Sequence, residues 1–523
     1  MIDQALYYIA TLTCAYSMAQ SVDIPKWQPY DFLFKSETEH QNPFKVIFSA
    51  TVNKPDGTSF SIPGFYDGDR TWKIRLSPTI EGPWSLQTHS DDPFLDDKIA
   101  FFTCIPNNPK FHGGLLVDTS NPYHFIYEDG TRYFMMGYEC DWLWALDMDD
   151  PNLPTINSFL DKLVSYRFNN IILNAYAHDT SWAKGKTVEY DYGPPPKYAW
   201  EGTNENPIFD RFNLSYWKHY DRVIDAMYQR GITAHIMIKV YNKMVKWQAK
   251  GSEEENLYFI WLIARYSAYP NVIWDFSKEA NNEKDLEYKL GRFKFIRDHD
   301  PYRRLLTNHD DKATYDTGVY NKILDFRSDQ QHSHWHEKIL SQRKQNVWPI
   351  VNVEFGYEHG PKGIDDKTYG VAQSPEEVCR RAWEICMAGG YIAYYYTYTA
   401  WDVIRPEDTP PGYAYFKYLY DFFNQTEYWL MEPADELVSD GYCLRNKNKE
   451  YIVFLNEAKT FKIKLEDGTY VAQWYDIFNG KYIDAGKVSG GEVEFIPPSG
   501  FNSFPIAIRI VISDQLCNME III

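Results

Sequence analysis

Two glutamates, Glu279 and Glu354, each follow a short apolar run that is typical of a buried parallel strand. The first run is N-V-I-W-D-F at residues 271–276, and the second is W-P-I-V-N-V at residues 348–353. The carboxyl ends of parallel barrel strands open onto one face, so both carboxylates are expected at the same mouth. Two carboxylates placed in this way are the equipment of glycoside hydrolysis.

This chemistry requires the two carboxylates to differ in protonation. A general acid must be protonated near neutral pH, which burial or a neighbouring carboxylate achieves by raising its pKa, whereas a nucleophile must stay ionised. Glu279 and Glu354 are the candidates for these two roles. A separation of about 5 Å would make the mechanism retaining, and about 6.5–9.5 Å would make it inverting. Lys278 would depress the pKa of Glu279 if it pointed inward, so its side chain is expected to point away from the site.

Each assignment has an alternative. Glu279 could be a solvated residue at the end of a strand. Glu354 could be structural, with Glu358 as the nucleophile. Asp275 is the fallback acid, although its register places it in the middle of the strand.

The loops after the predicted strands supply polar and aromatic residues that could contact a substrate. A metal site in the His332–His336 cluster is the weaker interpretation, because no paired carboxylate and histidine spacing supports one. We therefore predict no metal and no cofactor. The substrate-binding candidates are Asn174, His178, Asp179, Tyr241, Asn242, His309, His332, His334, Glu358 and, as an aromatic floor, Trp401.

The elements that must position these residues alternate between strands and helices, which predicts a parallel sheet. Eight strands over roughly 320 residues indicate a (β/α)8 TIM barrel. Ser252 and Ser374 are expected to cap two of its helices, each with a glutamate three residues later. The predicted strands are residues 133–137, 169–174, 232–240, 271–276, 304–307, 322–326, 350–353 and 391–395.

Short alternating strands flank the barrel on both sides. They predict an N-terminal immunoglobulin-like β-sandwich at residues 21–107 and a C-terminal β-sandwich at residues 433–523, which leaves 108–432 for the barrel. In the C-terminal region, Asn479-Gly480 is a type I′ hairpin signal.

The first 20 residues have an apolar middle and a Ser17-Met18-Ala19 stretch that suits signal-peptidase cleavage, although no Lys or Arg precedes them. We therefore predict a signal peptide and a secreted or periplasmic location; the alternative is a frayed apolar tail. No later stretch reaches the length of a membrane helix.

The net charge of −19 argues against nucleic acid as a partner. The 17% aromatic content suits either a carbohydrate binder or Tyr-rich sandwich cores.

Beyond these patterns, N-V-I-W-D-F-S-K-E at 271–279 resembles the fourth strand of the clan of retaining (β/α)8 glycosidases that includes cellulases and mannanases. In that clan the strand ends in Asn-Glu and the Glu is the acid/base; residues 349–356 resemble its seventh strand, which ends in the nucleophile. The resemblance therefore implies that Glu279 is the acid/base and Glu354 the nucleophile. Residues 206–232 and E-F-G-Y-E at 354–358 resemble, more closely, the apiosidase-like glycoside hydrolases, as does the order of the three domains. Lys278 departs from the clan, whose Asn at this place contacts the sugar's 2-hydroxyl.

Together these features predict a glycoside hydrolase that cleaves O-glycosidic bonds of a plant or microbial polysaccharide or oligosaccharide. The alternative is a non-catalytic carbohydrate-binding or cell-surface protein on a degenerate barrel, which only the Lys278 departure supports. The sequence leaves open the sugar, the linkage, exo or endo action and the oligomeric state.

Overall fold

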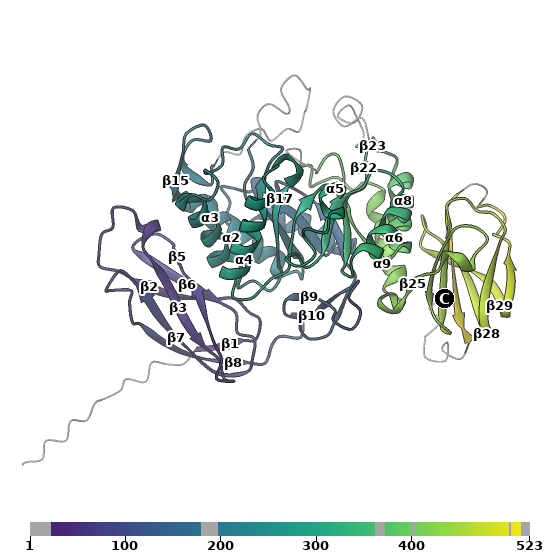
Figure 1. Cartoon of the computed structure of the whole chain (residues 1–523), viewed down its shortest axis with the longest axis horizontal. Helices are drawn as coiled ribbons and strands as arrows, with labels where there is room; N and C mark the ends of the chain where they lie inside the picture. The colour runs from purple at the N-terminus through teal and green to yellow at the C-terminus, as the bar shows by residue number, and fades with distance from the viewer. Residues whose placement is uncertain (1–21, 179–196, 361–371, 400–403, 502–503, 514–523) are drawn as a thin grey trace, which may run out of the picture.

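The structure is a computed structural model, and it describes residues 22–178, 197–360, 372–399, 404–501 and 504–513. A parallel barrel lies between two β-rich domains (Figure 1). Asp179, Trp401 and the predicted signal peptide lie outside the described residues. Within the part of the chain that is described, no helix is long and apolar enough to span a membrane.

The barrel sheet has the strand order β18-β17-β16-β13-β12-β24-β21-β20-β19, and all its pairings are parallel. The two edge strands of this sheet, β18 and β19, are consecutive in the chain and separated only by Asn308. They therefore share the fifth barrel position, and the sheet closes. The strands are β12 (Met136–Glu139), β13 (Asn170–Asn174), β16 (Thr233–Val240), β17 (Val272–Lys278), β18 (Leu306–Thr307), β19 (His309–Asp310), β20 (Arg327–Gln330), β21 (Ile350–Glu354) and β24 (Tyr391–Tyr394).

A helix follows each barrel position. Ser252 and Ser374 cap their helices as predicted, because each hydroxyl accepts a hydrogen bond at 3.2 Å from the backbone N–H of the glutamate three residues later. The helices are α1 (Pro154–Ser165), α2 (Leu214–Tyr228), α3 (Glu253–Tyr266), α4 (Leu286–His299), α5 (Lys312–Asp316), α6 (Trp335–Gln345), α8 (Pro375–Met387) and α9 (Gly412–Phe423).

The predicted (β/α)8 barrel is confirmed, but two of its strands lie elsewhere than expected. The first strand begins at Met136, because Tyr133 belongs to the hairpin of β10 (Phe125–Tyr127) and β11 (Arg132–Tyr133). This shift brings Glu139 to the mouth of the barrel. The sixth strand is β20, not residues 322–326; its Arg-Ser-Asp run is polar and buried, so hydrophobicity could not reveal it.

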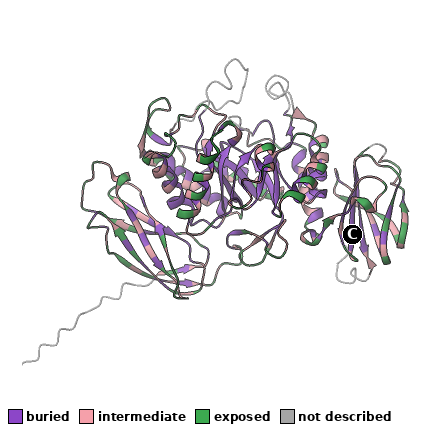
Figure 2. Ribbon diagram, viewed as in Figure 1, coloured by how far each residue is buried: buried purple, intermediate pink, exposed green. Residues whose placement is uncertain are grey.

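The predicted N-terminal immunoglobulin-like sandwich is present as two facing sheets. One has the order β1-β8-β7-β3-β4 and the other β2-β6-β5, with an aromatic core between them. Burial alternates along these strands, whereas the barrel strands are buried throughout (Figure 2). The strands are β1 (Val22–Pro25), β2 (Tyr30–Lys35), β3 (Phe48–Asn53), β4 (Ser59–Pro63), β5 (Phe65–Tyr66), β6 (Thr71–Leu76), β7 (Gly82–Ser90) and β8 (Ile99–Ile105).

The C-terminal domain is one antiparallel sheet that folds over itself. The long strand β28 (Phe461–Asp476) breaks register between Leu465 and Thr469, so its two halves cover opposite sides of an apolar core. The hairpin to β29 (Lys481–Phe495) is present, but its turn is not type I′. Its loop spans residues 477–480, and only Gly480 has a positive φ. The other strands are β25 (Glu432–Pro433), β26 (Tyr442–Asn446), β27 (Glu450–Leu455) and β30 (Ile506–Ile512).

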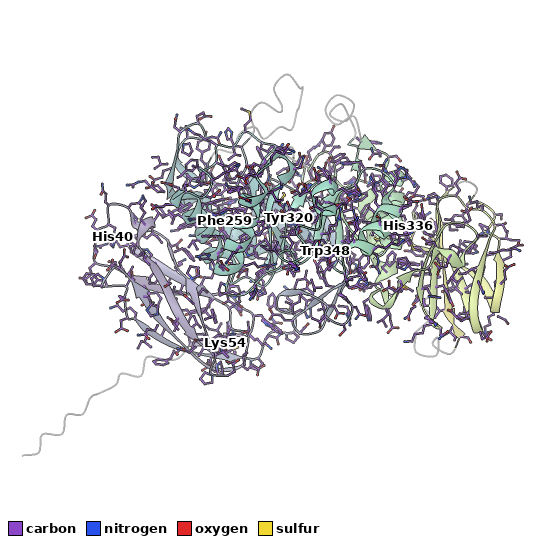
Figure 3. All side chains as sticks on the ribbon, viewed as in Figure 1. His40, Lys54, Phe259, Tyr320, His336 and Trp348 are labelled. Atoms are coloured by element: carbon purple, nitrogen blue, oxygen red, sulfur yellow. The ribbon has the colours of Figure 1, made fainter. Side chains whose placement is uncertain are left out.

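His336 joins the barrel to the C-terminal sheet, at the place where these two parts meet in Figure 3. Its Nδ1 lies 3.0 Å from the backbone oxygen of Glu384, and its Nε2 lies 2.8 Å from Oδ2 of Asp435. Both ring nitrogens therefore face acceptor oxygens, one on α8 and one in the C-terminal domain. The ring also stacks on Tyr442 with centroids 3.8 Å apart. His336 therefore belongs to this interface and not to a substrate pocket.

Arg75 joins the N-terminal domain to the barrel. This buried guanidinium binds Asp31 of its own domain, reaches Asp221 of α2 at 3.3 Å and donates to the backbone oxygen of Arg265 at 2.9 Å. Although burial raises the pKa of Asp221, Arg265 and Arg75 lower it to about 2. The ion cluster is therefore fully charged at neutral pH.

We expect Arg75→Ala to destabilise the protein by about 3 kcal/mol, because it leaves Asp221 and Asp31 short of a buried partner. Urea denaturation followed by tryptophan fluorescence measures this loss. The control is Arg70→Ala, which removes an exposed guanidinium. Equal midpoints for the two variants would show that the Arg75 cluster contributes nothing to stability.

Candidate active site

Glu354 ends β21 at the mouth of the barrel, and its carboxylate is held by three side chains. The hydroxyl of Tyr357 donates to Oε1, and that of Tyr395 donates to Oε2 at 3.5 Å. The Gln330 amide, turned so that its nitrogen faces the carboxylate, lies 3.1 Å from Oε2. Only 6% of the residue is exposed. The carboxylate is therefore fixed in orientation and largely shielded from water.

The pKa of Glu354 is about 7, well above its usual range. Burial raises it most, the Lys278 ammonium opposes this, and the Glu279 carboxylate adds to the rise. His309 Nε2 lies 3.9 Å from Glu354 Oε2. Burial and the nearby Lys278 charge lower the pKa of His309, so the imidazole is neutral beside the carboxylate.

Lys278 points into the barrel, so the expectation that it would point away from the site was wrong. Its Nζ contacts Glu139, lies 2.9 Å from Asp141 Oδ2, and donates to the Tyr395 hydroxyl at 3.1 Å. Regular alternation would have placed it on the same side as Phe276, which packs outward on Phe293 of α4. The alternation fails between these two residues at the end of β17.

Glu139 and Asp141 are site residues that the sequence reasoning missed. Both are fully buried, and both face the Lys278 ammonium from the end of β12. The signal that could have found them is two carboxylates at positions i and i+2 directly after the first apolar barrel strand. No such signal marks three other site residues. Tyrosine is polar only at its hydroxyl and glutamine is common in loops, so Tyr357, Tyr395 and Gln330 could not be singled out.

Glu279 follows Lys278 in a left-handed conformation, with φ 49° and ψ 50°. It is half-buried, and its Oε2 accepts from Asn282 Nδ2 at 3.3 Å. Its charge acts on both Glu354 and His332, so Glu279 lies near both residues at the mouth of the barrel. Because the left-handed residue reorients the chain, Lys278 and Glu279 both face the site although they are neighbours.

Several other predicted residues lie on the same side of the barrel. Asn174 ends β13, fully buried, and its backbone N–H donates to the Asp141 backbone oxygen at 3.0 Å. His178 is buried against Tyr198, with ring centroids 5.7 Å apart. His332 and His334 are exposed after β20, and His334 precedes α6 in a left-handed conformation.

The structure does not bring Tyr241 or Glu358 to the Glu354 cluster. Tyr241 packs on Phe276, on the helix side of β17. Glu358 accepts from the Tyr394 hydroxyl at 2.6 Å and from the Gly412 N–H at 3.2 Å. Tyr394 and Tyr395 alternate along β24, so Glu358 lies behind the barrel wall while Glu354 lies inside. Asn242 is half-buried after β16.

Asp275 is placed within the barrel below the mouth. Its carboxylate lies 2.9 Å from His235 Nε2 and accepts at 3.0 Å from the His309 backbone N–H. These contacts occupy both of its oxygens. The residues that are described contain no group of three or more His, Cys, Asp or Glu side chains arranged to hold a metal ion.

A parallel (β/α)8 barrel with carboxylates at the ends of its fourth and seventh strands is the arrangement of glycoside hydrolases. Residues 119–431 match the family described as "Apiosidase-like, catalytic domain". The chain therefore belongs to the apiosidase-like family, as the sequence motifs predicted, and it is a glycosidase that hydrolyses O-glycosyl bonds. Residues 23–91 match a domain family of unknown function, DUF5060.

Solved structures share this fold. A Bacteroides vulgatus protein described as a candidate glycoside hydrolase is 21% identical, with a TM-score of 0.78 over 94% of this chain and 100% of its own. A glycoside hydrolase family 5 protein of the same species is 19% identical, with a TM-score of 0.61 over 77% and 94%. No curated protein matches the chain in sequence.

Glu358 provides a test of which glutamate is structural. Burial raises the pKa of Glu358 from its usual 4.5 to about 7. Between these two pH values, Glu358 is protonated in the folded protein and ionised in the unfolded chain. Its stabilising contribution is therefore greatest at low pH and is lost as pH rises from about 4.5 to about 7.

We expect Glu358→Gln to gain stability relative to the parent across this pH window and to retain turnover. Thermal unfolding between pH 4 and 8, with Glu376→Gln as an exposed control, measures the difference. A constant difference across the window, or loss of turnover with an unchanged melting temperature, would contradict the structural role.

Proposed function

We propose that this glycosidase acts by a retaining, two-carboxylate mechanism in which Glu354 is the nucleophile and Glu279 is the acid/base. The observation that carries the proposal is the Glu354 carboxylate, fixed at the end of β21 and electrostatically coupled to Glu279 at the end of β17. Two carboxylates coupled across a barrel mouth can act on opposite faces of one glycosidic bond.

In the first step Glu354 attacks the anomeric carbon, while Glu279 gives its proton to the leaving oxygen. The C–O bond breaks and a glycosyl ester forms on Glu354. In the second step Glu279 removes a proton from water, and the resulting oxygen nucleophile attacks the anomeric carbon and releases Glu354.

The division of roles rests on the orientation and exposure of each carboxylate and not on its pKa, since burial raises the pKa of Glu354 to about 7. A nucleophile needs a fixed orientation, which Tyr357, Tyr395 and Gln330 give Glu354, and the buried Lys278 ammonium favours its charged form. An acid/base must take a proton from the attacking water in the second step, and Glu279 is half-buried at the rim. Lys278 therefore assists the proposed nucleophile.

The substrate that we propose is a glycoside of a plant or microbial polysaccharide or oligosaccharide. The family description supports an apioside or a related glycoside. We also propose that the enzyme acts outside the cytoplasm, which the apolar N-terminal stretch with its Ser17-Met18-Ala19 site supports. N-terminal sequencing of the protein secreted by its host would test the location.

Glu354→Gln should reduce hydrolysis of any substrate to background, because no covalent intermediate can form.

Glu279→Gln should hydrolyse a natural linkage about 10²- to 10⁴-fold more slowly than the parent. The loss of rate should be much smaller on an aryl glycoside with a good leaving group. Azide should restore turnover to Glu279→Gln as a glycosyl azide, since azide needs no base. The assay compares both variants on a panel of aryl glycosides and plant polysaccharides, with Glu376→Gln as the control. Full activity of Glu354→Gln would refute the assignment, and an inverted first-formed anomer by proton NMR would refute the retaining mechanism.

The pH profile separates the two possible roles of Glu354. If Glu354 attacks, kcat/KM should rise with pH through about 7, because only the ionised form is nucleophilic. If Glu354 instead donated the proton, kcat/KM would fall with pH through the same value.

Lys278→Gln should move this rising limb to higher pH, since the variant loses the cation that favours ionised Glu354. The exposed Lys284→Gln serves as the matched control. A limb that stays in place in Lys278→Gln would show that the Lys278 charge does not act on Glu354.

A further inference from the structure

Asp141 and Asn174 lie fully buried at the ends of neighbouring barrel strands, with polar atoms that make no hydrogen bond to the described residues. Oδ2 of Asp141 faces the Lys278 ammonium at 2.9 Å, whereas its Oδ1 and both amide atoms of Asn174 make no hydrogen bond there. The Asn174 backbone N–H donates to the Asp141 backbone oxygen at 3.0 Å, so the two residues are adjacent. Folded proteins rarely leave such groups unpaired, so their grouping at one mouth points to a polar ligand.

Carboxyl groups surround Asp141, with the Lys278 ammonium among them. Its Oδ2 lies 2.9 Å from the Lys278 ammonium, which also contacts Glu139 and stabilises ionised Glu354. Burial raises the pKa of Glu139 well above its usual range. Three carboxylic groups, those of Glu139, Asp141 and Glu354, thus share one cation, and His309 beside them is neutral.

Resting on the proposed glycosidase function, we infer that Asp141 and Asn174 bind adjacent hydroxyl groups of the sugar whose anomeric carbon Glu354 attacks, and that the acidic surroundings restrict this sugar to an uncharged one. A carboxylate accepts from two hydroxyls, and an amide both donates to and accepts from them. Each unsatisfied atom thereby gains a partner, whereas a uronic acid would bring a further negative charge among carboxylates.

The two residues are reached from different strands, which fixes the geometry of recognition. Asp141 follows β12, and Asn174 ends β13, which pairs with β12 in the barrel. Their side chains are therefore carried by rigid neighbouring elements. Lys278 holds Asp141 from the opposite direction, since it extends from β17.

The first arm of the test identifies the sugar. Purified parent enzyme is incubated with 4-nitrophenyl glycosides in matched pairs, glucoside with glucuronide and galactoside with galacturonide, and with pectin, whose released sugars are analysed by mass spectrometry. We expect only neutral sugars to be released. Release of a uronic acid at a comparable rate would overturn the inference while leaving the glycosidase function intact.

The second arm measures Asp141→Asn and Asn174→Ala on the released sugar's aryl glycoside and on its monodeoxy analogues. We expect each variant to lose about 10²-fold in kcat/KM. On the analogue that lacks the contacted hydroxyl, the parent should lose a similar factor in kcat/KM. The matching variant should lose little more, because it already lacks that interaction. Fully additive losses would show that the residue does not contact that hydroxyl and would overturn the inference.

Asp149→Asn is the matched control, since its carboxylate lies in the same segment but is 85% exposed and pairs with Lys197. It should retain parent activity. Thermal unfolding of every variant separates loss of binding from loss of folding, and Asn174→Ala keeps the inference testable if Asp141→Asn does not fold. No turnover by the folded parent on any substrate would refute the proposed function itself, and with it this inference.

Discussion

The ion cluster around Lys278 is the interaction on which the catalytic mouth depends. An ammonium without water is stable only with charged or hydrogen-bonding partners, and this one reaches them on strands other than its own. Glu139 and Asp141 come from the segment that ends β12, and Tyr395 follows β24. Tyr395 then donates to Glu354 at the end of β21. One buried cation thereby ties four strand ends to the position of the proposed nucleophile.

The end of β17 shows how two neighbouring residues can serve one site. Phe276 packs among the helices, Lys278 crosses the barrel, and Glu279 adopts a left-handed backbone. A non-glycine residue in that conformation costs of order 1–3 kcal/mol, which the surrounding structure must offset. The strained residue is Glu279, the proposed acid/base. Its left-handed backbone lets the Lys278 ammonium point into the barrel while the Glu279 carboxylate stays at the mouth.

The sequence predicted the architecture well because hydrophobic runs and helix caps are local signals. The barrel, both flanking β-domains and the caps at Ser252 and Ser374 followed from them. The sixth strand was misplaced because its buried residues are polar, as Arg327 is, which pairs with Asp316 and Asp329, so no hydrophobic run marks the strand. The site was also predicted only in part. Glu279 and Glu354 were marked by their strands, whereas the direction of Lys278 and the roles of Glu139 and Asp141 depend on contacts across the barrel that no local pattern encodes.

The flanking domains contact the barrel through its helices, and the N-terminal domain also contacts the strand β15 (Pro207–Phe212). Arg75 engages α2 and α3, while His336 and Trp383 carry the C-terminal sheet on α6 and α8, Trp383 by stacking on Phe454 at 5.5 Å. In the described residues, the partners of Glu354 and Lys278 all come from the barrel and its loops. The two β-domains therefore support the barrel wall, and the chemistry is assigned to the strand ends alone. A buried cation with its carboxylates needs such rigid walls, because any widening of the barrel would separate charges that are stable only in contact.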